Sequence, residues 1–193
     1  MQARDKLARL RVASLLEWES WLARSHESSP GVWLELAKKG AAVVTVTYAE
    51  ALDGALCFGW IDGQKAALDE RFWLQRFTPR RPRSRWSQIN RERADALERE
   101  GRMRAAGVAQ VERARQDGRW EAAYAGQRTA LVPEDLRSAL AANPRAGAFF
   151  EALDGANRYA ILYRIQDARR AQTRAERIAR YVAMLAAGKT IHP

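Results

Sequence analysis

Apolar residues in the first quarter of the chain recur at helical spacing, and each run follows a residue that can cap a helix. Ser14 stands three residues before Glu17, and Thr47 stands three residues before Glu50. This is the spacing of a capping box, in which the two side chains satisfy each other's backbone N–H groups. The pattern predicts two helices, over residues 14–27 and from residue 47 to about residue 57.

The next part of the chain has the pattern of strands. Residues 58–65 and 71–78 are rich in aromatic side chains and are separated by a short polar segment, which predicts an antiparallel hairpin. Pro79 and Pro82 end the second strand, because proline cannot donate to a β-ladder. Residues 32–36 alternate loosely and predict a third strand.

The remainder reads as helical. Ser84 can cap a helix that ends at Gly101, and Thr173 begins a further capping box with Glu176. We expect helices over residues 84–100 and 105–116. Four more should follow: one opened by Pro133, one by Asn143 and Pro144, one after Gly155, and one from Thr173 to Gly188. The predicted fold class is α+β, a small antiparallel sheet with flanking helices followed by an all-helical C-terminal part. We expect two domains, residues 1–125 and residues 126–193.

Composition narrows the class of protein. The chain has 193 residues, 47% of them apolar and 29% charged, as in an ordinary globular protein. Cys57 is the only cysteine, which excludes an internal disulfide and a zinc site of several cysteines. The sequence contains no apolar run of membrane-spanning length and no pattern of a secretory signal, so we expect a cytoplasmic location.

Basic residues exceed acidic ones, 33 against 23, which gives a formal net charge of +10. The excess is local: residues 76–104 hold ten arginines and four acidic residues, and residues 158–180 hold seven and two. Arginine has a planar fork that suits phosphate and carboxylate groups, so these segments are candidate anion-binding surfaces. The alternative interpretation places the same charges on solvated helix faces.

Signatures of known chemistry are missing from the sequence. His26 and His192 are the only histidines and have no metal-ligand spacing, and no dinucleotide or phosphate-binding fingerprint occurs. We therefore expect no metal and no cofactor, and assign no catalytic residue. Asp62 or Asp69 could act as a general base beside the arginines, but both also stand where turns are favoured. Cys57 is more typical of a buried apolar position than of a nucleophile.

The segment after the hairpin offers the strongest candidate site. A helix start that follows arginines and a tryptophan could receive an anion, with guanidinium groups as the clamp and an aromatic ring for stacking. The candidate ligand-binding residues are Trp60, Asp62, Arg76, Arg80, Arg81, Ser84, Arg85, Trp86, Ser87 and Asn90. The expected partner is an anionic small molecule or an acidic protein surface, and nucleic acid is a weaker alternative. The competing interpretation is that the tryptophans fill the core and Ser84 only caps its helix.

A family resemblance is carried mainly by residues 57–63 and 77–90, and it extends to residues 31–34, 38–39, 48–51, 117–120, 133–136, 168–170, 173–174 and 177–178. They resemble the YdeI/OmpD-associated family, also called bacteriocin-protection proteins, and the resemblance runs in order from about Trp18 to Gly188. It implies a stress-associated role linked to antimicrobial-peptide tolerance, and it brings no established catalytic residues to carry over. The N-terminal half is similar to YdhG-like α+β domains.

Overall fold

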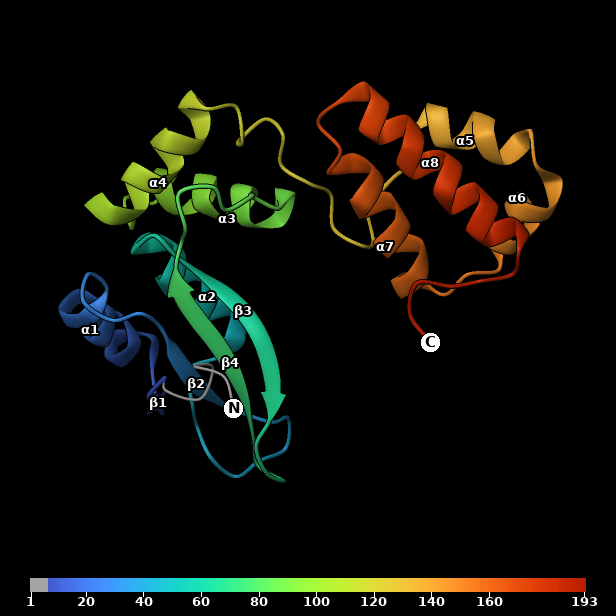
Figure 1. Ribbon diagram of the computed structural model, residues 1–193. Helices are drawn as coiled ribbons and strands as arrows, with labels where there is room; N and C mark the ends of the chain where they lie inside the picture. The colour runs from blue at the N-terminus through green and yellow to red at the C-terminus, as the bar shows by residue number, and fades with distance from the viewer. Residues whose placement is uncertain (1–6) are drawn as a thin grey trace. The chain divides into compact units, whose positions relative to one another are not determined.

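The computed structural model describes residues 7–193, and within them the chain forms one four-stranded sheet and eight helices (Figure 1). Contacts divide the chain into two compact units. Of the described residues, the first unit contains residues 7–86 and 90–123, and the second contains Ser87–Ile89 and Tyr124–Pro193. The first unit holds the sheet and the second is helical, so the predicted α+β fold class is confirmed.

The sheet has the strand order β1-β2-β4-β3, with β1 parallel to β2 and the other neighbours antiparallel. Its strands are β1 (Arg9–Leu10), β2 (Val32–Ala37), β3 (Trp60–Ala67) and β4 (Phe72–Pro79). The predicted hairpin and third strand are confirmed within two residues at each end. Strand β1 was not predicted, because two residues are too few to show an alternating pattern.

Helices α1 (Leu15–Ser25) and α2 (Tyr48–Cys57) cover the apolar face of the sheet. The capping box predicted at Thr47 is present: its side chain accepts from the Glu50 N–H, and the Glu50 carboxylate accepts from the Thr47 N–H. At Ser14 only half of the predicted box forms, since the Ser14 side chain accepts from the Glu17 N–H but the Glu17 carboxylate accepts from the Ala13 N–H. The Trp18 indole N–H donates to the Ala51 carbonyl oxygen (2.9 Å), which ties α1 to α2. The same unit contains α4 (Ala105–Gln116) and most of α3 (Gln88–Arg99), whose first two residues belong to the second unit.

The second unit is built from α5 (Glu134–Ala141), α6 (Pro144–Glu151), α7 (Gly155–Gln166) and α8 (Ala171–Ala186). Its core gathers buried side chains from all four helices, among them Leu136, Phe150, Ile161 and Leu185. Asn143 caps α6 as expected, and Asp154 caps α7. Gly188 has a φ of +68°, which only glycine adopts without strain, and it stands just beyond the end of α8.

Helix α8 begins at Ala171, two residues before the capping box predicted at Thr173. The prediction is wrong because the Glu176 carboxylate does not reach back to the Thr173 backbone. Instead it accepts a hydrogen bond from the Gln172 side chain (3.1 Å), as an exposed pair one turn apart. The residue at the N-cap is Arg170, and its side chain makes no capping hydrogen bond.

Candidate functional site

Residues 80–87 connect β4 to α3 and contain most of the predicted anion-binding residues; we call this segment the arginine turn. Ser84 closes it, since its N–H donates to the Arg81 carbonyl oxygen (2.9 Å) and its Oγ accepts from the Arg81 N–H (3.1 Å). The prediction that Ser84 caps the next helix is wrong: its hydroxyl is used inside the turn, and α3 begins only at Gln88.

Arg80 and Trp86 form a buried stack beneath the turn. Arg80 is 6% exposed, its guanidinium carbon lies 3.5 Å from the centroid of a Trp86 ring, and its Nη1 donates to the Arg85 carbonyl oxygen (3.3 Å). Arg119 adds a bond from Nη1 to the Ser84 carbonyl oxygen (2.7 Å). Both guanidinium groups bind the backbone of the turn, so these contacts hold it in one conformation.

Arg81 and Arg83 lie at the exposed tip of the turn. Among the residues that the structure describes, no carboxylate lies within ion-pair distance of either guanidinium group. Arg85 is half-buried. Arg76 lies on β4 instead and donates from Nη1 to the Gln64 side chain (3.0 Å). The turn therefore presents two cationic side chains on a constrained backbone.

Three other predicted residues lie outside this tip. Trp60 is buried in the core, and its indole N–H donates to the His26 carbonyl oxygen (3.1 Å). Ser87 and Asn90 are half-buried, one just before α3 and one within its first turn, and Ser87 forms a β-bridge with Tyr124. The contacts thus bring Arg80, Arg81, Ser84, Arg85 and Trp86 together and leave the Trp60 ring in the core.

The two candidate carboxylates have local partners. Asp62 accepts from the Tyr48 hydroxyl (2.8 Å), and burial together with this hydrogen bond raises the pKa of Tyr48. Asp69 accepts from the backbone N–H groups of Arg71 (2.8 Å) and Phe72 (2.9 Å), bonds that lower the pKa of Asp69. The first contact joins helix α2 to strand β3 and the second belongs to a tight turn, and they give no support to a general base.

Cys57 is buried at the end of α2, and burial raises the pKa of its thiol to about 11. A thiol in this state is protonated at neutral pH and is a poor nucleophile. Within residues 7–193, no three side chains of histidine, cysteine, aspartate or glutamate form a cluster that could hold a metal ion. None of the helices in the same residues is long and apolar enough to cross a membrane.

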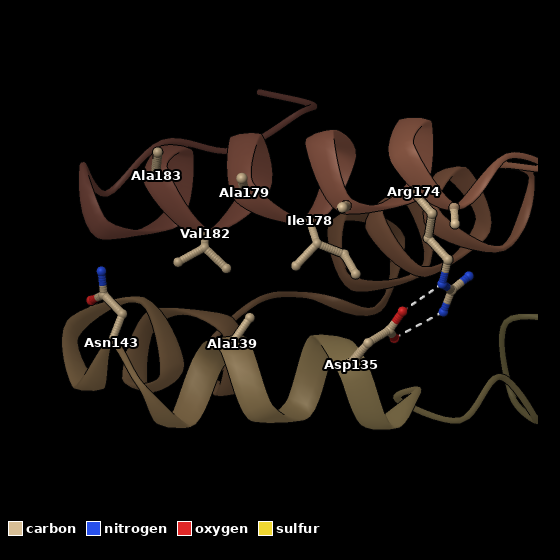
Figure 2. A pocket seen from close by; sticks show the side chains of 10 residues that line it. Asp135, Ala139, Asn143, Arg174, Ile178, Ala179, Val182 and Ala183 are labelled. Carbon is tan, nitrogen blue, oxygen red and sulfur yellow. Dashed lines mark hydrogen bonds and ion pairs between the residues drawn. The ribbon is translucent and has the colours of Figure 1, made fainter.

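A groove of about 630 Å³ opens between α5 and α8 in the helical unit. Figure 2 shows the side chains of the two helices facing each other across it. From α8 it is lined by Ala171, Ala175, Ala179 and Ala183, four exposed alanines spaced four residues apart. This spacing places them in one row along the helix, and their small side chains leave the backbone accessible to a neighbour.

The walls of the groove are apolar and its two ends are polar. Ala139 of α5 faces Ile178 and Val182 of α8 (Figure 2). At one end the Arg174 guanidinium binds the Asp135 carboxylate through Nε (2.5 Å) and Nη2 (2.9 Å). These bonds lower the pKa of Asp135. At the other end lies Asn143.

The groove is the functional candidate that sequence reasoning missed. Its signal is present in the sequence, since Ala171, Ala175, Ala179 and Ala183 recur every four residues. A row of alanines is equally typical of a helix face packed against its own domain, so the pattern alone does not distinguish an open groove from a core.

Comparison with family models gives two matches. Residues 10–110 match a domain of unknown function, DUF8412, and residues 129–188 match a model described as Bacteriocin-protection, YdeI or OmpD-Associated. The second match contains every residue that lines the groove. The similarity of the N-terminal half to YdhG-like domains stays a prediction. Searches of curated proteins and of solved structures returned no match.

Proposed function

Because the chain belongs to the bacteriocin-protection, YdeI or OmpD-associated family through residues 129–188, and to the DUF8412 family through residues 10–110, we propose a binding function for it. In this proposal the protein is a stress or antimicrobial-peptide-tolerance factor. It acts by holding a helical peptide segment in the groove between α5 and α8.

The groove is the observation that supports this proposal. Its row of alanines runs from Ala171 to Ala183, which corresponds to about 18 Å of helix at 1.5 Å per residue. An amphipathic helix of three turns presents an apolar stripe of the same length. Binding in such a groove buries apolar surface on both partners, which is the main favourable contribution to helix-in-groove recognition.

The test uses a fluorescein-labelled, hydrocarbon-stapled 15-residue helix of leucine, alanine and glutamine, with fluorescence anisotropy as the readout. The full chain should bind it. Ala179→Trp, which fills the middle of the groove, should weaken binding at least about tenfold. Ala156→Trp, a matched change at an exposed alanine of α7, should leave binding unchanged. Absence of binding, or equal binding by the Ala179→Trp variant, would refute the proposal.

The arginine turn supports a second candidate function, the binding of an anionic partner. Arg81 and Arg83 have no carboxylate partner in the described part of the chain, and the backbone beneath them is held by Arg80 and Arg119. A constrained pair of guanidinium groups loses little conformational freedom when it binds a carboxylate or phosphate. Anionic small molecules, acidic protein surfaces and nucleic acid share this chemistry.

A labelled polyglutamate peptide and a labelled single-stranded oligonucleotide serve as probes for this second function. The double variant Arg81→Gln, Arg83→Gln should bind the preferred probe about fivefold more weakly at low salt, with a smaller salt dependence. The double variant Arg99→Gln, Arg113→Gln removes the same charge from α3 and α4 and should bind like the parent. Equal losses in both variants would show that only net charge matters.

A further inference from the structure

The two walls of the groove run in the same direction. Asp135, in the first turn of α5, faces Arg174, in the first turn of α8, whereas Asn143 and Ala183 lie at the opposite end (Figure 2). Both helix N-termini therefore lie at the Arg174 end of the groove. The positive ends of the two helix dipoles lie together there, and the negative ends lie together at the Asn143 end.

Nothing in the side chains of the two N-caps offsets this polarity. Neither Pro133, the N-cap of α5, nor Arg170, the N-cap of α8, makes a side-chain capping hydrogen bond. The acidic residues in the first turn of α5 are already paired: Asp135 with Arg174 and Glu134 with Arg137 (2.8 Å).

Unpaired positive charge adds to the same end. Arg169 and Arg170 are exposed just before α8, and no carboxylate within residues 7–193 lies within ion-pair distance of either. At the Asn143 end, Arg145 and Lys189 are also exposed, but they stand beside the negative ends of the two helix dipoles. The exposed cations near the groove therefore differ in their surroundings: Arg169 and Arg170 lie beside the positive ends of the two helix dipoles, and Arg145 and Lys189 lie beside the negative ends.

From this charge distribution we infer that the groove receives an acidic amphipathic helix, which lies antiparallel to α5 and α8 with its C-terminal end beside Arg169, Arg170 and Arg174. This inference rests on the proposed function and specifies its partner. The negative end of the bound helix dipole and the acidic side chains of its last turn then face the positive end of the groove. A cationic peptide has the wrong charge, so the occupant is an acidic helix of a protein partner.

The test uses stapled 15-residue helices with the same apolar stripe of leucine and alanine. One carries three glutamates in its last turn, the second carries them in its first turn, and the third carries three lysines in its last turn. The staple keeps all three helical, so that the effect of charge position on helix formation does not enter the comparison.

At 50 mM salt the peptide with C-terminal glutamates should bind about tenfold more tightly than the one with N-terminal glutamates, and the lysine peptide most weakly. The difference should shrink at 500 mM salt. Arg169→Gln with Arg170→Gln should reduce the preference to about twofold. Arg145→Gln with Lys189→Gln, a matched change at the other end, should leave the preference in place.

The outcomes separate this inference from the proposed function. If none of the helices binds, the proposed function fails. If all bind and Ala179→Trp blocks them, but charge position has no effect, the groove is a helix site and the polarity is refuted. Tighter binding of the lysine peptide would also refute it. Sedimentation velocity tests whether the groove binds a second copy of the chain. A dimer that the Ala179→Trp substitution dissociates would mean that the groove is an interface between copies.

Discussion

The ion pair between Asp135 and Arg174 gives a stability prediction that can be worked out from its geometry. The carboxylate and guanidinium share two hydrogen bonds, and the side chains are 45% and 27% exposed. Exposed pairs contribute about 0.2–1 kcal/mol, and the two-bonded geometry places this one near the top of that range, at about 1 kcal/mol. Arg174 also donates from Nη1 to the Ile165 carbonyl oxygen (3.0 Å), a bond worth about 1 kcal/mol.

Arg174→Ala should therefore lower the free energy of unfolding of the helical unit by about 2 kcal/mol, and Asp135→Ala by about 1 kcal/mol. The double variant should lose about 2 kcal/mol instead of the sum, which leaves a coupling energy of about 1 kcal/mol. All seven tryptophans lie in the first unit. Urea denaturation followed by far-UV circular dichroism reports on the helices of both units, and tryptophan fluorescence reports on the first unit alone.

The coupling energy should depend on pH with a defined sign. Arg174 lowers the pKa of Asp135 in the folded chain, whereas an unfolded aspartate titrates near pH 3.9. The coupling is then fully present above about pH 5 and is lost as the pH falls through the lowered folded pKa. A coupling energy near zero at pH 7, or one that is unchanged at pH 3, would refute the role given to this pair.

Three further predictions concern the packing of each unit. Asn157→Ala removes an amide that accepts from the backbone N–H of His192 (2.9 Å) and donates to the carbonyl oxygen of the same residue (3.3 Å); it should cost about 2 kcal/mol, measured by urea denaturation. Gly107→Ala places a Cβ 2.3 Å from the Cys57 carbonyl oxygen and should cost about 1–3 kcal/mol. Gly63→Ala, whose new Cβ meets ordinary 3.7 Å contacts, should cost less in the same assay. Finally, burial raises the pKa of the Cys57 thiol to about 11, so this thiol should react with iodoacetamide at pH 8 far more slowly in the folded chain than in urea. Equal reaction rates in the two states would contradict its burial.

Local signals in the sequence account for much of the fold. The capping box at Thr47 and the side-chain caps at Ser14 and Asn143 act over three residues, so the sequence alone identifies them. Ser84 has the same chemistry, but its hydroxyl bonds within a turn that Arg80 and Arg119 support from beneath. Arg119 is far away in the sequence, and such long-range support is invisible to a local pattern.

The candidate site shows the same limit. Sequence reasoning located the arginine-rich segment but not the burial of Arg80 against Trp86, because the stack depends on how the turn folds over the ring. The α5–α8 groove depends on the relative placement of two helices separated by more than twenty residues. The row of alanines was visible in the sequence, but whether it faces a neighbour or solvent is decided by tertiary packing.

The most direct test of the central claim is a chemical-shift map. The stapled helix with C-terminal glutamates is titrated into the uniformly ¹⁵N-labelled full chain, and the backbone amide signals are followed. The account predicts that the largest shifts fall on Ala139, Ala175 and Ala179, along both walls of the groove. Shifts confined to the arginine turn or to the sheet, with the amides of α5 and α8 unmoved, would contradict it.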